Sequence, residues 1–273
     1  MKRSIRTLSL FLCLALMFSF QAFAYGGSVI DASTASDGYF TVHYTQNSSA
    51  AMRVGVSHNG KTIYYNYTPG EATAYAFTEG DGQYGIKLYQ HVSGNSYRVL
   101  ANVGLNVTLT DEYAPYLIST NEITFAQDDA VGLKAAELCE GLTTDAEKIV
   151  AIHKFIASNY KYNRTFAEDV RSGKITSYTP DTNAMLDTNV GVCYDFSALF
   201  AAMCRSQGIP CAMLKGYYMN GGYHAWNMVL VDDEWVAVDL TLAVLYRKMN
   251  ADELSDCTVS LKSYHGYSFN LAA

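Results

Sequence analysis

Short runs of alternating apolar and polar residues dominate the chain between residues 25 and 112. Aromatic and β-branched residues are frequent in these runs, and Gly- or Asn-rich turns separate them. The runs are Tyr39–Tyr44, Met52–Ser57, Lys61–Tyr67, Thr73–Phe77, Tyr84–Gln90, Tyr97–Ala101 and Leu105–Leu109. The Asn59–Gly60 step between the second and third runs is typical of a tight hairpin. Strands at this spacing predict a small antiparallel β-sandwich over residues 25–112, which we expect to be an accessory or binding domain.

Helical periodicity replaces this alternation beyond a linker near residues 111–125. Apolar positions within 130–138 predict one helix, and the run Thr143-Thr144-Asp145 is expected to cap a second helix over 146–159. The buried face of the second helix is expected to consist of Ile149, Ile152, His153 and Ile156. The polar stretch 163–190 predicts a long loop, and long loops inside compact domains are usually functional or mobile.

A third predicted helix carries the cysteine of greatest chemical interest. Its buried face is expected to consist of Phe196, Leu199, Phe200 and Met203. Gly208 and Pro210 end this helix, and Cys193 stands at its N-terminus. There the helix dipole favours a thiolate, and the free N–H groups of the first turn can stabilise charge on a substrate oxygen. The alternative is that Cys193 is a small buried apolar residue, as most free cysteines are.

A hairpin near the end of the chain is expected to bring a histidine and a carboxylate together. One run ends at Val231, a second runs over 235–240, and Asp232–Asp233 forms the two-residue loop between them. This register places Trp226 opposite Asp239, with His224 diagonally beyond it on the same face. A carboxylate in that position can hold an imidazole in one tautomer, and the imidazole can activate a thiol. A strand histidine considered alone is more often structural.

The first 24 residues have the pattern of an export signal. Basic residues at positions 2, 3 and 6 precede the apolar run Leu8–Phe20, and Ala22-Phe23-Ala24 follows it. This pattern predicts a signal peptide over residues 1–24 that is cleaved before Tyr25. The alternative is an uncleaved N-terminal anchor. We therefore expect a secreted or cell-surface protein with no stable membrane insertion after cleavage.

Charge and cysteine content narrow the possible functions. The 273-residue chain is 49% hydrophobic, and loss of residues 1–24 would change its net charge from −7 to −10, because they hold three basic and no acidic residues. Such a chain lacks the basic surface that nucleic-acid binding requires. Five cysteines would remain: Cys139, Cys193, Cys204, Cys211 and Cys257. This odd number fits one reactive thiol with up to two disulfides, or five reduced thiols. Cys204 and Cys211 form too small a set to predict zinc, so we expect no metal or other cofactor.

Several motifs together resemble the transglutaminase-like superfamily, in particular its small secreted bacterial members. The motifs are Gly191–Asp195, Gly208–Pro210, Lys215–Tyr217, His224–Trp226 and Trp235–Thr241, and the resemblance covers roughly residues 145–245. It implies an α+β fold with a papain/transglutaminase-like core over residues 113–273, following the β-sandwich. Members commonly have proline where this chain has Leu240 and often tryptophan soon after, where it has Leu242.

The same resemblance implies roles for individual residues. Cys193 would be the nucleophile, His224 the base, and Asp239 the residue that orients the histidine. Tyr162 and Trp226 are weaker candidates for contacts with the oxyanion or the substrate, and for Tyr162 simple packing is the alternative.

The expected chemistry is attack by a thiolate on an amide carbonyl of a protein or peptide substrate, with cell-wall peptides among the candidates. We expect water to accept the acyl group, which would make the chain a cysteine protease or amidase. The alternatives are a protein-cross-linking transglutaminase and a non-catalytic cell-surface interaction module. NlpC-type cell-wall peptidases also use Cys then His, but the strand 235–241 with its aspartate fits the transglutaminase-like pattern better.

Overall fold

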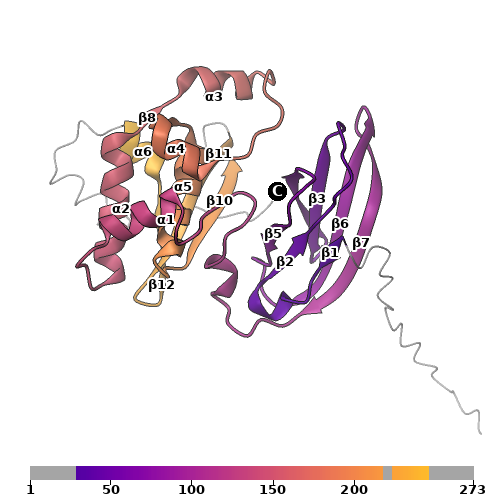
Figure 1. Cartoon of the computed structure of the whole chain (residues 1–273), viewed down its shortest axis with the longest axis horizontal. Helices are drawn as coiled ribbons and strands as arrows, with labels where there is room; N and C mark the ends of the chain where they lie inside the picture. Colours follow the sequence, from indigo (N-terminus) through magenta and orange to yellow (C-terminus); the bar gives the residue numbers. More distant parts are fainter. Residues whose placement is uncertain (1–28, 218–222, 246–273) are drawn as a thin grey trace, which may run out of the picture.

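A computed structural model describes residues 29–217 and 223–245. The predicted signal peptide and Cys257 lie outside the described residues. An antiparallel β-sandwich comes first, and a unit of helices packed on a second antiparallel sheet follows it (Figure 1). This confirms the expected α+β fold. Within the described ranges, no helix is long and apolar enough to cross a membrane.

The sandwich consists of two sheets that share one hydrophobic core. Strands β1 (Ile30–Asp31), β2 (Tyr39–Val42) and β5 (Thr73–Ala76) form one sheet in that order. The second sheet has the order β4-β3-β6-β7, with β3 (Met52–His58), β4 (Lys61–Tyr67), β6 (Gly82–Ser93) and β7 (Ser96–Val107). The side chains between the sheets include Phe40, Tyr75, Phe77, Ile86 and Leu88, all fully buried.

In this domain the structure confirms one predicted turn and contradicts a predicted break between two strands. Asn59 and Gly60 both have positive φ, as the hairpin between β3 and β4 requires, so the predicted turn is confirmed. The runs 97–101 and 105–109 were expected to be separate strands, and this was wrong, because β7 runs without a break from Ser96 to Val107. Gly104 pairs with Gly85 of β6, so this glycine belongs to the ladder and not to a turn.

The second unit packs its helices against the sheet β10-β11-β12, made of Cys211–Tyr217, Tyr223–Val231 and Glu234–Val238. Its helices include α1 (Ala130–Leu138), α2 (Asp145–Asn159), α5 (Cys193–Ser206) and α6 (Leu240–Leu245). Helix α5 lies in the centre of this unit, and its predicted apolar face is fully buried. Two short 3₁₀ turns, η1 (Ala35–Asp37) and η2 (Ala114–Tyr116), precede this unit; η2 lies in the linker.

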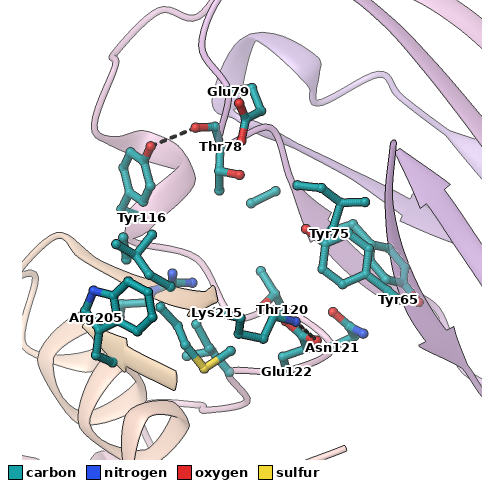
Figure 2. A pocket seen from close by; sticks show the side chains of 17 residues that line it. Tyr65, Tyr75, Thr78, Glu79, Tyr116, Thr120, Asn121, Glu122, Arg205 and Lys215 are labelled. Carbon is teal, nitrogen blue, oxygen red and sulfur yellow. Dashed lines mark hydrogen bonds and ion pairs between the residues drawn. The ribbon is translucent and has the colours of Figure 1, made fainter. Parts of the chain in front are cut away.

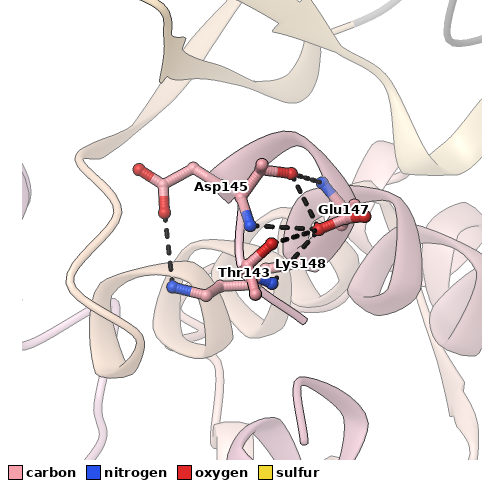
Figure 3. Close-up of polar contacts among 5 residues, drawn as sticks. Thr143, Asp145, Glu147 and Lys148 are labelled. Atoms are coloured by element: carbon pink, nitrogen blue, oxygen red, sulfur yellow. Dashed lines mark hydrogen bonds and ion pairs between the residues drawn. The ribbon is translucent and has the colours of Figure 1, made fainter. Parts of the chain in front are cut away.

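Helix α2 begins where the sequence predicts, at a capping box (Figure 3). Thr144 Oγ1 accepts a hydrogen bond from the Glu147 amide at 3.3 Å. The Glu147 carboxylate in turn accepts hydrogen bonds from the amides of Thr143 and Thr144, at 3.1 and 3.0 Å. These contacts satisfy N–H groups that the first helical turn leaves without acceptors.

The prediction of one long loop over residues 163–190 was wrong. This stretch contains the helices α3 (Arg164–Arg171) and α4 (Thr182–Thr188), and β9 (Val190–Gly191) after them pairs in parallel with β8 (Lys161–Tyr162). Asn163 caps α3 through the Phe166 amide, and Asp181 caps α4 through the Ala184 amide, each at 3.0 Å. Asn and Asp are favoured N-cap residues, so these two positions indicated helix starts. The polar composition of the surrounding stretch nevertheless led to the prediction of a loop.

Candidate active site

Cys193 is the first residue of helix α5. The backbone directly before Cys193 is held by Asp195, whose Oδ2 accepts a hydrogen bond from the Val192 amide at 2.8 Å. None of the four cysteines in the described ranges forms a disulfide there; Cys193 is partly exposed, whereas Cys139, Cys204 and Cys211 are buried. Among these thiols, that of Cys193 is therefore the one that can be reached from solvent.

Asp195 also joins the helix to the segment before it. Its carboxylate is buried and accepts a hydrogen bond from the Tyr178 hydroxyl at 2.5 Å. Burial raises the pKa of Asp195, although the hydrogen bonds from Tyr178 and Val192 oppose this shift. The Tyr178 carbonyl accepts a hydrogen bond from Asn66 of β4 at 3.2 Å. Asp195 thus lies in the first turn of α5 and also links the start of this helix to a contact with the sandwich.

The β11–β12 hairpin has the predicted register. Val231 pairs with Glu234, and Asp232 and Asp233 between them both have positive φ, as in a two-residue type I′ loop. The last pair of the ladder is Asn227 with Val238. One further step places Trp226 opposite Asp239, with His224 diagonally beyond. Accordingly, His224 Nε2 lies 2.9 Å from Asp239 Oδ2.

The second carboxylate oxygen of Asp239 caps helix α6. Oδ1 accepts hydrogen bonds from the amides of Thr241 and Leu242, at 3.0 and 3.3 Å. Leu240 is therefore the first residue of α6, a position that proline tolerates particularly well. Leucine in place of the family's proline is compatible with the same helix start, so the departure leaves the geometry of Asp239 intact.

His224 connects this carboxylate to the thiol. Burial lowers the pKa of His224, but hydrogen bonds with Asp239 and Cys193 outweigh it, and the pKa rises to about 9. Asp239 occupies Nε2, which leaves Nδ1 as the ring nitrogen available to Cys193. Cys193, His224 and Asp239 thus lie in one hydrogen-bonded series, with the imidazole in the middle.

Tyr162 and Trp226 flank this series. Burial raises the pKa of Tyr162, and the nearby Cys193 adds to the shift. The Tyr162 ring also lies 6.3 Å from the Phe196 ring, which is a packing contact. The Trp226 ring stacks on His224 with centroids 6.1 Å apart. A Cβ atom at Gly216 would lie 3.1 Å from Trp226, so a glycine there leaves room for the indole.

A buried acid beside the site was not predicted from any pattern in the sequence. Glu122, in the linker, accepts a hydrogen bond from the Tyr194 hydroxyl, and Lys215 Nζ lies 2.6 Å from Glu122 Oε1. The Lys215 ammonium also lies 5.2 Å from the centre of the Tyr194 ring and 5.6 Å from that of Tyr65 in the sandwich. Burial and the charge of Glu122 raise the pKa of Tyr194. Tyr194, the residue after Cys193, is therefore hydrogen-bonded to the linker.

The remaining candidate groups do not form a metal centre. Within residues 29–217 and 223–245, no three His, Cys, Asp or Glu side chains are grouped to hold a metal ion. Cys204 and Cys211 are buried thiols in contact with each other, and burial raises the pKa of Cys204. The chemistry available at the site is that of a thiol beside a hydrogen-bonded imidazole.

Residues 134–240 match the family model described as the Transglutaminase-like superfamily. Two curated proteins named Kyphoscoliosis peptidase are similar to part of the chain. The human protein is 29% identical over 119 residues and the mouse protein 27% over 117, covering 39% of this chain and 17% of each relative. The chain thus matches about a sixth of the length of these relatives.

Two solved structures show weaker similarity. A "Putative Cysteine Protease" from Cytophaga hutchinsonii has 19% identity and a TM-score of 0.42, over 77% of this chain and 73% of that one. The periplasmic domain of TgpA from Pseudomonas aeruginosa has 12% identity and a TM-score of 0.35, over 74% and 93%.

Proposed function

Because residues 134–240 belong to the transglutaminase-like superfamily, we propose that this chain is a thiol enzyme that acts on amide bonds of proteins or peptides. Cys193 is the nucleophile, His224 the proton carrier and Asp239 the residue that orients it. The observation that carries the proposal is the hydrogen-bonded series of these three side chains at the start of a buried helix.

The first half of the reaction uses the imidazole as an acid. With its pKa raised to about 9, His224 carries a proton at neutral pH, and a cation beside a thiol favours the thiolate. The sulfur attacks the carbonyl carbon, a C–S bond forms, and the carbonyl π electrons move to oxygen. First-turn N–H groups of α5 can stabilise that oxyanion. His224 then protonates the leaving nitrogen as the C–N bond breaks, which leaves an acyl-enzyme.

The second half returns the enzyme to its starting state. Water or an amine attacks the thioester carbonyl, and His224 accepts the proton of the attacking group. The C–S bond then breaks and the sulfur leaves as a thiolate. Asp239 holds the ring throughout, so that one nitrogen always faces the sulfur. We propose water as the acceptor, which makes the protein a cysteine protease or amidase; the relatives named peptidases support this choice.

One incubation separates hydrolysis from transfer. A glutamine-containing protein is mixed with the enzyme and a labelled primary amine, and mass spectrometry counts cleaved, deamidated and amine-labelled products. Cys193→Ala serves as the control. An excess of hydrolysis products supports the proposal, whereas an excess of amine-labelled product would make the protein a cross-linking transglutaminase. If no product forms and iodoacetamide alkylates Cys193 no faster than an ordinary thiol, the enzyme proposal fails. The chain would then be a non-catalytic interaction module.

The proposal also covers the roles of the two domains and the export of the protein from the cell. Residues 25–112 act as an accessory domain to the catalytic residues 113–273, and residues 1–24 direct export to the cell surface or the medium. Sequencing the N-terminus of the exported protein tests the last point. A mature chain that begins at Tyr25 supports it, and a retained Met1 would contradict it.

A further inference from the structure

A cavity of about 190 Å³ lies where the sandwich, the linker and the catalytic unit meet (Figure 2). Each of the three parts contributes to its walls. Side chains that matter for its chemistry are Tyr65, Tyr75, Tyr116, Arg205, Lys215 and Trp226.

This cavity adjoins the candidate active site. Trp226 lines it and also stacks on His224, with ring centroids 6.1 Å apart. Glu122 lines it too and is hydrogen-bonded to Tyr194, the residue after Cys193. A group held in the cavity would therefore contact Trp226, which stacks on His224, and Glu122, which is hydrogen-bonded to the neighbour of Cys193.

The Tyr75 hydroxyl is the clearest sign of a ligand. The side chain is fully buried, and within the described part of the protein its oxygen has no hydrogen-bond partner. In Figure 2 this oxygen faces the hollow between the lining residues. Two other tyrosines nearby are bonded: the partly buried Tyr116 donates to the Thr78 carbonyl at 2.9 Å, and the buried Tyr67 accepts from the Tyr44 amide at 2.7 Å. A buried hydroxyl without a partner is unfavourable, so a bound hydrogen-bonding group would improve it.

Arg205 adds a buried cation to the same wall. Its Nε and Nη2 donate to the Cys211 carbonyl and its Nη1 to the Ile118 carbonyl, all at 2.7–2.9 Å. Burial lowers its pKa to about 10, so it remains charged at neutral pH. Among the described residues, its partners are carbonyl groups and no carboxylate pairs with it. A cation in this setting favours the electron-rich face of an aromatic ring.

The size of the cavity fits one ring. An apolar cavity of about 150 Å³ is known to take up benzene, so about 190 Å³ has room for a ring with a small polar substituent. The aromatic side chains in the walls can pack against such a ring.

We propose that this cavity binds a tyrosine side chain of the protein that donates the acyl group, with the ring near Arg205 and the phenol hydrogen-bonded to Tyr75. The identity of this donor rests on the proposed function, but the ability of the cavity to bind a phenol does not.

The first test uses p-cresol, the side chain of tyrosine, and toluene, which lacks its hydroxyl. Binding to the full-length protein is followed by NMR through the indole N–H of Trp226. Tyr75→Phe should weaken p-cresol binding roughly fivefold, the loss of one hydrogen bond, and leave toluene binding unchanged. Equal p-cresol affinity in wild type and Tyr75→Phe, or no shift of Trp226, would overturn the proposal.

Folding controls accompany this measurement. Tyr75→Phe removes a hydroxyl without a partner and should leave the thermal midpoint equal or higher. Tyr67→Phe removes a bonded hydroxyl and should lower the midpoint without changing p-cresol affinity. If Tyr75→Phe lowers the midpoint as much as Tyr67→Phe does, its hydroxyl is already bonded, by water for example, and the argument for a ligand fails.

The second test concerns the donor. Acyl-donor peptides that differ only in one Tyr or Leu near the amide are compared by kcat/KM, and the wild type should prefer Tyr while Tyr75→Phe loses that preference. Turnover with no preference would contradict the cavity as a tyrosine subsite. Binding of p-cresol without turnover of any peptide would instead contradict the proposed function and leave the phenol site standing.

Discussion

Asp239 holds His224 with one carboxylate oxygen and the start of helix α6 with the other. The Nε2–Oδ2 distance is 2.9 Å, and the Oδ1 contacts are with the amides of Thr241 and Leu242. The residue that orients the imidazole is thus itself fixed by a helix. A change at this carboxylate should alter the chemistry through the orientation of the histidine.

Asp239→Asn tests this relationship. The amide keeps the shape of the carboxylate but cannot stabilise the same imidazole tautomer and charge, so we expect kcat/KM to fall by about 10²- to 10⁴-fold. Asp232→Asn is the matched control, because asparagine accepts the positive φ of that turn and the site is untouched. A fall of less than threefold for Asp239→Asn would contradict the role of Asp239.

The raised pKa of His224 predicts a definite pH dependence of stability. The pKa is about 9 in the folded protein and about 6.5 in the unfolded chain, so the stabilisation is complete below pH 6.5 and is lost as the pH rises through 9. It amounts to about 3 kcal/mol by linkage. Urea unfolding of wild type and His224→Gln from pH 6 to 10 should show their difference shrinking over this window. A constant difference would contradict the shift.

His153 predicts a loss of stability in acid. It is buried on helix α2, and burial lowers its pKa to about 4. Between pH 6.5 and 4 the unfolded chain therefore binds a proton that the folded protein does not, and stability falls as the pH falls, by about 3 kcal/mol. In His153→Leu this loss should be absent. Denaturant unfolding at pH 4.5, 5.5 and 7 compares the two proteins, and parallel pH profiles would refute the assignment.

The Glu122–Lys215 pair should couple the linker to the second unit, in which Lys215 lies on β10. Both side chains are largely buried, at 12% and 22% exposure, and their charged atoms lie 2.6 Å apart. Removing one partner leaves a buried charge, so Glu122→Gln and Lys215→Met should each destabilise the fold, and the double variant by less than the sum. We expect a coupling free energy of about 1–2 kcal/mol in a double-mutant cycle. Additive effects would show that the ions do not interact appreciably.

Gly191 leaves little room for a side chain at the start of α5. A Cβ atom there would lie 2.8 Å from Cβ and 3.0 Å from Oδ2 of Asp195. Gly191→Ala should therefore displace Asp195, destabilise the protein by about 1–3 kcal/mol and slow alkylation of Cys193 by iodoacetamide. Gly104→Ala is the control, because a Cβ atom there has only an ordinary contact at 3.9 Å. Equal alkylation rates in both variants would contradict the predicted effect of Gly191 on the Cys193 thiol.

The hairpin shows what the sequence alone can predict. A two-residue loop and the alternation of a strand determine which residues face each other, so the meeting of His224 and Asp239 follows from local spacing. The helix start at Cys193 follows in the same way from its apolar periodicity and from Gly208 beyond its end.

Contacts between distant segments left no comparable signal. Glu122 lies in a linker without periodicity, and its partners Tyr194 and Lys215 are 72 and 93 residues away along the chain. Tyr178 and Asn66 are 112 residues apart. Such pairs depend on how the sandwich packs on the second unit, which no local pattern encodes. Helices α3 and α4 are a different case, because their N-cap residues were visible but surrounded by polar sequence.

Arg205 has a consequence for where this protein can be cut. The guanidinium sits at the end of α5, inside the segment that matches the family, yet its Nη1 donates to Ile118, 16 residues before that segment begins at residue 134. A fragment of residues 134–240 would leave that N–H without its acceptor, and would also lose Glu122 from Lys215. A fragment that keeps both contacts is therefore longer than the segment that matches the family, and it begins at or before Ile118.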